Sequence, residues 1–170
     1  ETRLVELYNT SSKQPDLEAL LLQPLNWTLA AAEPTVLILH THGTESYTPG
    51  TEAYISTSSY RTLDENYNML SMGAALAQLL EEAGIPTVQD RELHDYPSYN
   101  GSYERSAATI SSYLEKYPTI SVLLDVHRDA VQREETLVKP VTEIDGEKTA
   151  QLMMIAGCDS KVVGLVSECH

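Results

Sequence analysis

Residues 35–45, TVLILHTHGTE, contain the pattern that decides the fold. The first part is a continuous run of aliphatic and β-branched residues, which is typical of a strand buried on both faces of a parallel sheet. The run stops at His40, and His42 and Glu45 follow directly. In open α/β sheets, ligands bind outside the carboxyl ends of the strands. The stretch therefore predicts a central strand with a candidate site at its end.

The segments that follow alternate between strand and helix patterns. We expect strands at 85–90, 119–127 and 151–157, a short helix within 15–23, and two long helices at 65–84 and 103–117. Asp64 and Ser102 are the expected N-caps of the long helices. Residues 128–150 read as a hairpin-like excursion that turns at Asp145 and Gly146. This order predicts right-handed crossovers and an open, mostly parallel sheet with helices on both faces.

Composition narrows the class of protein. The chain has 170 residues, of which 42% are hydrophobic, so it is long enough for one globular domain with a sizeable core. A net charge of −14 argues against nucleic acid and anionic lipid as partners. No apolar run approaches the roughly 20 residues of a membrane span, and the start has no signal-peptide pattern. Either the protein is cytoplasmic, or a leader or anchor precedes this sequence. Cys158 and Cys169 form neither a disulfide framework nor a zinc motif.

Two histidine-bearing clusters follow strand ends. His42 and Glu45 form an H-x-x-E pair after the first strand, and His127 follows the third. Because the first and third strands of such a sheet can be neighbours, His127 can complete a His–Glu–His set. Catalytic zinc takes three such ligands and leaves one position for water. If the strand continues to residue 42, the side chains of His40 and His42 point to the same face of the sheet, about 6–7 Å apart.

Around the second cluster, Asp125 or Asp129 could orient the His127 ring from behind. The same residues also have an ordinary interpretation, in which Asp125, Arg128 and Asp129 form a salt-bridge cluster. Glu45 could equally cap a loop. The two clusters together, rather than either alone, favour a metal site.

The remaining aromatic and imidazole groups carry a weaker signal. His94, in ELHDY, is interpreted as a surface loop residue. Loop tyrosines can stack on sugars or peptides, but we favour ordinary packing for them (Tyr47, Tyr54, Tyr60, Tyr96, Tyr99 and Tyr103).

Four segments carry a family resemblance. VLILHTHGTESY at 36–47, DENYNMLSMGAALAQLLEEAGI at 64–85, YNGSYERS at 99–106 and LLDVHRDA at 123–130 resemble the stage II sporulation protein P family. The resemblance covers residues 34–157. It implies an amidase-like α/β catalytic domain over 34–157, after a lead-in segment at 1–33 and before an atypical tail at 158–170.

The resemblance also implies an activity. Family members are similar to zinc-dependent N-acetylmuramoyl-L-alanine amidases, which cut the amide between muramic acid and L-alanine, and they also cut a bond in the peptide cross-links. They act outside the cytoplasmic membrane, behind an N-terminal anchor, at the sporulation septum during engulfment. Their implied partners are peptidoglycan and the sporulation stage II proteins D and M.

Site residues follow from the same resemblance. His42 and His127 match the family's histidines and would hold Zn²⁺. Two glutamates compete for the third ligand position. Glu45 fits the T-E-S pattern beside the first histidine, whereas Glu65, just before Asn68, fits the glutamate that opens the first long helix in the related amidases. We rank Glu45 first.

Two further residues are candidates for catalysis. Glu104, in SYERS, is a candidate cleft carboxylate, and Arg128 could bind a substrate carboxylate or stabilise an oxyanion. The related amidases also place a proton-transferring glutamate on a late strand. Here the sequence after 151–157 is CDSKVVGLVSECH, which matches nothing in the family. We therefore expect a fold without the last strand and helix. The alternative function is a catalytically impaired, truncated module that binds the wall or a partner.

Overall fold

The computed structural model describes residues 16–24, 28–47, 60–138 and 140–155. The chain divides into two compact units: Trp27–Val131 forms one, and Glu1–Asn26 with Gln132–His170 forms the other. Within the described residues, none of the helices has the length and apolar character needed to span a bilayer.

The larger unit is built on a parallel sheet of three strands, which confirms the α/β fold. They are β1 (Val36–Leu39), β2 (Thr87–Gln89) and β3 (Val122–Asp125), in the order β2-β1-β3. The pairing runs from Val36 opposite Val122 to Leu39 opposite Asp125. All four residues of β1 are at most 3% exposed, as expected for a central strand covered on both faces.

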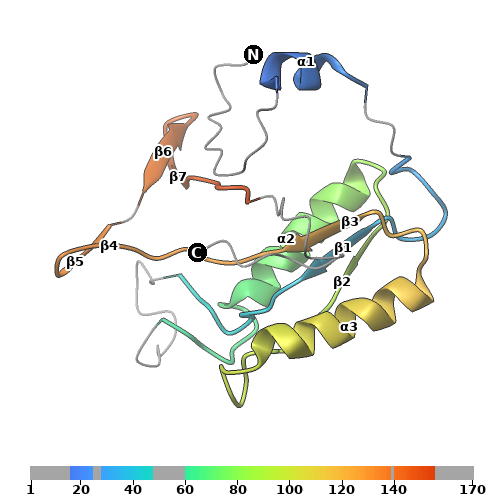
Figure 1. Cartoon of the computed structure of the whole chain (residues 1–170). Helices are drawn as coiled ribbons and strands as arrows, with labels where there is room; N and C mark the ends of the chain where they lie inside the picture. Colours follow the sequence, from blue (N-terminus) through green and yellow to red (C-terminus); the bar gives the residue numbers. More distant parts are fainter. Residues whose placement is uncertain (1–15, 25–27, 48–59, 139, 156–170) are drawn as a thin grey trace. The chain divides into compact units, whose positions relative to one another are not determined.

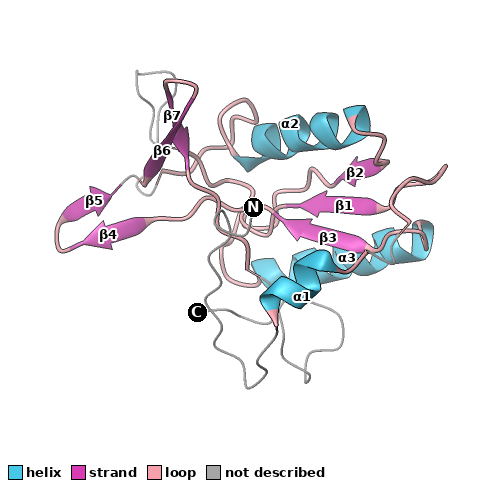
Figure 2. Cartoon of the chain, turned by 90° about the horizontal axis from the view of Figure 1, so that it is seen from above, coloured by secondary structure: helices cyan, strands magenta, loops and turns pink. Residues whose placement is uncertain are grey.

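Two long helices flank this sheet on opposite sides, α2 (Met69–Glu82) and α3 (Ser102–Lys116) (Figure 1, Figure 2). The arrangement follows from the strand order. The chain passes from β1 to β2 through α2, and from β2 to β3, on the other side of β1, through α3. Because the two crossovers have the same handedness but run in opposite directions across the sheet, their helices lie on opposite faces. The carboxyl ends of β1 and β3 thus meet where the strand order reverses, the usual ligand position in such sheets.

Both long helices begin differently from the sequence prediction. α2 starts at Met69, because the buried Asn68 accepts a hydrogen bond from the Leu70 N–H (3.0 Å) and caps the helix. Asp64, the predicted cap, instead accepts from the Asn66 N–H in a local turn (3.0 Å). Ser102 lies inside α3 rather than capping it, after Gly101 in the left-handed conformation.

Gly73 allows α2 to approach the sheet closely. A Cβ atom at this position would overlap the ring of His40 and the side-chain amide of Gln89. His40 is fully buried; its Nδ1 donates to the Val126 carbonyl (3.0 Å), and its Nε2 lies 3.0 Å from the Gln89 amide nitrogen. The Gln89 amide also donates to the Leu70 carbonyl (2.9 Å). One imidazole therefore links β1, β2, α2 and the end of β3.

The remaining elements lie outside the three-stranded sheet. α1 (Leu17–Leu22) is capped by Asp16, β4 (Val131–Arg133) pairs with β5 (Thr136–Val138), and β6 (Val141–Ile144) pairs with β7 (Glu147–Ala150). Asp145 and Gly146 both have positive φ, which is typical of a tight hairpin turn and confirms the predicted turn.

The prediction of a fourth strand at 151–157 is wrong over the described residues 151–155. These residues form no strand, and Leu152 and Met154 are 96% and 92% exposed. An apolar run becomes a strand only where a partner satisfies its backbone groups, and none of the described strands pairs with it. Residues 156–157 and the predicted tail at 158–170 lie outside the described residues.

Candidate metal centre

The chain turns sharply after β1. The strand ends at Leu39, residues 41–44 form a turn, and the Glu45 N–H donates to the His42 carbonyl (3.1 Å). This turn brings the side chains of His42 and Glu45 to one side. His40 does not share this site with His42, as it would if the strand continued. Its ring is buried against Gln89 and Val126. Strand alternation does not apply beyond Leu39, because the strand stops there.

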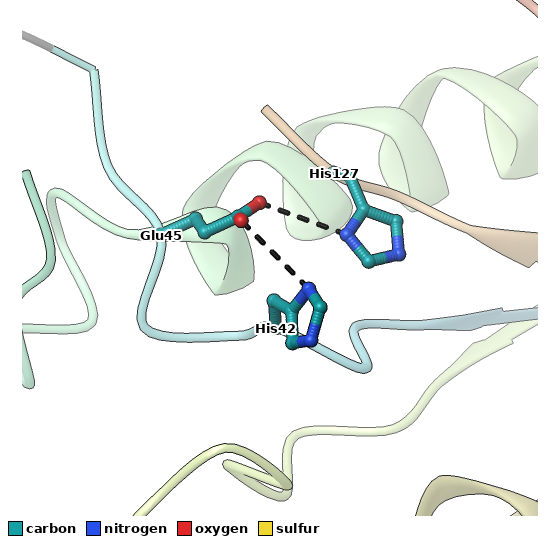
Figure 3. A group of neighbouring side chains, drawn as sticks. All are labelled: His42, Glu45 and His127. Carbon is teal, nitrogen blue, oxygen red and sulfur yellow. Dashed lines mark ion pairs between the residues drawn. The ribbon is translucent and has the colours of Figure 1, made fainter. Parts of the chain in front are cut away.

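His42, Glu45 and His127 form the candidate metal group (Figure 3). Each offers one ligand atom, and these atoms lie within 4.8 Å of one another. His42 Nδ1 is 3.8 Å from Glu45 Oε1, and His127 Nδ1 is 3.6 Å from Glu45 Oε2. The Glu45 carboxylate faces both imidazoles from the turn, and His127 reaches it from the end of the neighbouring β3.

His127 is held by a carboxylate on its far side. Its Nε2 lies 3.0 Å from Asp125 Oδ2, and Asp125 itself accepts from the Thr41 N–H (2.9 Å) and hydroxyl (2.7 Å). Burial by itself lowers the pKa of His127, but its interactions with the carboxylates of Asp125 and Glu45 outweigh it and raise the pKa to about 10. Of the two predicted orienting residues, Asp125 is the one in contact with the ring; Asp129 accepts from the Ala130 N–H (2.7 Å).

Glu45 is buried and fixed at both oxygens. Oε1 accepts from the Arg61 guanidinium (3.2 Å), and Oε2 accepts from the Arg128 N–H (3.1 Å). Burial raises the pKa of Glu45, but the nearby His127 ring, the hydrogen bond from the Arg128 N–H and the charge of Arg61 outweigh it, so the pKa is lowered. The carboxylate is therefore anionic and oriented, as a metal ligand must be.

His42 has a less polar environment. Burial lowers its pKa, which favours the neutral ring that can act as a ligand. Tyr99 stacks on it with ring centroids 4.6 Å apart, and Tyr103 meets it edge-on at 5.4 Å. Its Nε2 is buried and has no hydrogen-bond partner among the described residues.

The donor set fits a divalent metal ion. Two imidazoles and one carboxylate, with separations near the ~3–4 Å expected between ligands of a tetrahedral ion, match the protein part of a catalytic zinc site. The carboxylate behind His127 matches the usual partner of a metal-bound histidine. The group can hold a metal ion.

The other predicted site residues lie apart from this group or meet it differently. Glu65, the alternative third ligand, forms an exposed ion pair with Arg91. Glu104 lies on the exposed first turn of α3. Arg128 meets Glu45 through its backbone N–H, and its guanidinium donates to the Tyr60 carbonyl (3.4 Å). The catalytic roles assigned to Glu104 and Arg128 stay predictions.

Two contributors to the site were not identified from the sequence. Arg61 bridges Glu45 and the buried Asp95, and Asp95 also accepts from the Thr44 N–H (3.1 Å) and hydroxyl. In the sequence, Arg61 is a single basic residue within a polar segment, so no local pattern identifies it as part of a site.

The interpretation of His94 as a surface residue is wrong, because His94 is fully buried and paired with Asp90 (2.8 Å), four residues earlier.

These features define a class: an α/β protein with a candidate His–Glu–His metal centre where its strand order reverses. The Stage II sporulation protein P (SpoIIP) family profile matches residues 3–166, and the chain belongs to this family. The match extends beyond the predicted 34–157 at both ends, so the expectation that nothing after residue 157 matches the family is wrong for 158–166. It is similar to Stage II sporulation protein P of Bacillus subtilis (strain 168), with 27% identity over 132 residues, which is 74% of this chain. The chain spans about a third (31%) of that protein's length. No solved structure matches.

Proposed function

We propose that this sporulation-family chain is a zinc-dependent N-acetylmuramoyl-L-alanine amidase that hydrolyses peptidoglycan. The observation that carries the proposal is the convergence of His42, Glu45 and His127 at the carboxyl ends of β1 and β3. Zinc held there would lower the pKa of a bound water toward about 7, which supplies a nucleophile for the amide carbonyl. Cleavage within the stem-peptide cross-links is a second reaction open to the same centre.

The chain's own residues have separate tasks in this proposal. In this proposal His42, Glu45 and His127 would bind the ion. Asp125 accepts a hydrogen bond from Nε2–H of His127, which leaves Nδ1 free of a proton, and Arg61 holds the Glu45 carboxylate in place. Arg128 lies beside Glu45 and is the candidate to bind a substrate carboxylate or the developing oxyanion.

We place this activity outside the cytoplasmic membrane, at the sporulation septum during engulfment, in a protein held there by an anchor outside this sequence. Peptidoglycan is the proposed substrate, and the sporulation stage II proteins D and M are the proposed partners. The family supports the sporulation context.

The test measures metal content and hydrolysis on the same preparation. We expect about one zinc ion per chain, release of muramoyl-linked peptides from purified sacculi, and loss of this release after chelation with recovery on adding zinc. A folded protein that binds no zinc and releases no peptide would reject the proposal.

A second candidate function rests on one observation. The candidate metal group contains a single carboxylate, Glu45, and a metal ligand is poorly placed to serve as the proton acceptor as well. A wall-binding module without catalysis would therefore retain zinc and sediment with sacculi but release no peptide. Zinc-dependent release by the same chain would exclude it.

Asp125→Asn is expected to weaken zinc binding about 10–100-fold, the usual effect of removing the partner of a metal-bound histidine. Both oxygens of Asp125 accept hydrogen bonds, one from the Thr41 N–H and the other from the His127 N–H (3.0 Å). Asparagine has a single acceptor oxygen and no charge, so it cannot keep both bonds. Competition with a chromophoric chelator measures the affinity. Asp129→Asn is the matched control, because Asp129 is exposed and accepts from the N–H of its neighbour Ala130. Equal affinities for the two variants would contradict the role assigned to Asp125.

The stability of the zinc-free protein is expected to fall between pH 6.5 and about 10. The pKa of His127 is raised from 6.5 to about 10 in the folded protein, so its stabilising contribution is complete below pH 6.5 and is lost as the pH rises through about 10. Bound zinc keeps the ring deprotonated, so the zinc-loaded protein should lose less stability over this window. Urea unfolding at pH 6, 8 and 10, with and without chelator, measures the effect. His127→Gln should abolish the fall; an unchanged fall in this variant would assign it to other groups.

A further inference from the structure

Two tyrosines form an aromatic wall beside the candidate ligand His42. The Tyr99 ring lies parallel to the His42 ring, with planes 19° and centroids 4.6 Å apart, and the Tyr103 ring meets it edge-on. Tyr99 and Tyr103 nevertheless remain 54% and 45% exposed. A ligand held beside His42 would therefore meet two partly exposed aromatic rings.

The loop that carries Tyr99 is fixed by one side chain. The Arg105 guanidinium, from α3, donates to the carbonyls of His94 (2.6 Å), Ser98 and Asn100 (3.2 Å). A guanidinium has five donors in a rigid fork, so three bonds to successive parts of one loop hold its path. Tyr99, between two of these carbonyls, is thus held in position before any ligand arrives. Such preorganisation is what a binding subsite requires.

The wall is not arranged to attract a carboxylate. Arg61 lies over the Tyr99 ring, 5.0 Å from its centroid, and its guanidinium donates to both Glu45 and Asp95. Two carboxylates therefore balance this cation, in a chain with a net charge of −14. What the wall presents to solvent is aromatic surface with phenolic hydroxyls, which can both donate and accept hydrogen bonds.

We infer that Tyr99 and Tyr103 form a saccharide subsite for the sugar ring next to the scissile amide; this inference rests on the proposed function. A sugar ring offers C–H groups that pack on aromatic rings and hydroxyls that bond with phenols, and it carries no charge. The peptide on the other side of the amide carries carboxylates, and the Arg61 charge at this wall is already balanced by Glu45 and Asp95. The neutral aromatic wall therefore selects the sugar side of the substrate.

The first test compares two substrates that share one peptide. One carries the muramoyl sugar, and the other carries only the lactoyl group in its place. For Tyr99→Ala, the preference for the sugar-bearing substrate, measured as the ratio of the two KM values, should fall about tenfold. Tyr117→Ala is the matched control, because Tyr117 stacks on Tyr113 at the other end of α3. A change of equal size on both substrates would mean that Tyr99 only supports His42, and would overturn the subsite.

The second test does not need turnover. A GlcNAc–MurNAc disaccharide, with its lactyl carboxyl blocked as the uncharged N-methylamide, is titrated into the full zinc-free chain, and binding is followed by NMR. Wild type and Tyr117→Ala should bind it, and Tyr99→Ala and Tyr103→Ala should bind it about tenfold more weakly. If wild type cleaves neither peptide, the proposed function fails, yet this titration still decides the subsite. Absence of binding by wild type, or equal binding by all four proteins, would overturn it.

Discussion

Glu45→Gln is expected to remove zinc binding and peptidoglycan hydrolysis together. Outer partners of metal ligands already contribute about 10–100-fold to affinity, so losing the only carboxylate among the ligands should cost more than about hundredfold. Glutamine keeps the size of the side chain but removes its charge. In wild type, Arg61 donates to one Glu45 oxygen and the Arg128 N–H donates to the other. The NH₂ group of glutamine would replace one of these oxygens and would face a donor that it cannot accept from. Zinc content after dialysis and peptide release from sacculi measure the two losses.

Glu65→Gln is the control that separates the two glutamates left open by the sequence. Glu65 is 54% exposed in its side chain and pairs with Arg91, so this variant should bind zinc and hydrolyse sacculi as wild type does. Circular dichroism of both variants checks that neither is unfolded. If Glu65→Gln loses zinc while Glu45→Gln retains it, the assignment of the ligand is reversed.

The parts of the fold that could be predicted have local signals. β1 is a continuous apolar run, and Asp145–Gly146 is a turn dipeptide whose two residues adopt the required positive φ. The start of α2 depended on more than local sequence. Asp64 and Asn68 are both good N-caps. Asn68 is the cap because its side-chain amide donates to the Thr62 carbonyl (3.3 Å) and its backbone forms a β-bridge with Ser46, and these contacts form only in the folded chain.

For the site, the sequence placed the two histidines at strand ends but could not choose the carboxylate. The pairing of β1 with β3 brings the ends of the two strands together, and the turn after β1 then places His42 beside His127. The choice between Glu45 and Glu65 depends on the path of the residues before α2. In the structure, this path pairs Glu65 with Arg91 and leaves Glu45 facing both imidazoles. Such a contact between distant loops has no periodic signature in a single sequence.

Gly73→Ala is expected to destabilise the larger unit by about 2–3 kcal/mol, because overpacking and a disrupted buried hydrogen bond outweigh the gain in helix propensity. The new methyl group would occupy the space of the His40 ring and the Gln89 amide. His40 holds the Val126 carbonyl, which belongs to the residue just before His127. A shift of the ring therefore reaches the metal centre, and zinc affinity should fall along with stability. Urea unfolding and chelator competition measure both.

Two variants isolate the cause of this loss. Ala75→Gly is the reverse substitution at an exposed position of α2. It should lower the free energy of unfolding only by the difference in helix propensity between alanine and glycine, about 1 kcal/mol. Gln89→Ala removes one of the two groups that the new methyl would strike. Gly73→Ala should therefore be less destabilising in the Gln89→Ala background than in wild type, because residues in contact are not additive. Strict additivity would show that Gly73 is required for a reason other than this close approach, and the link from α2 through His40 to the metal centre would then be rejected.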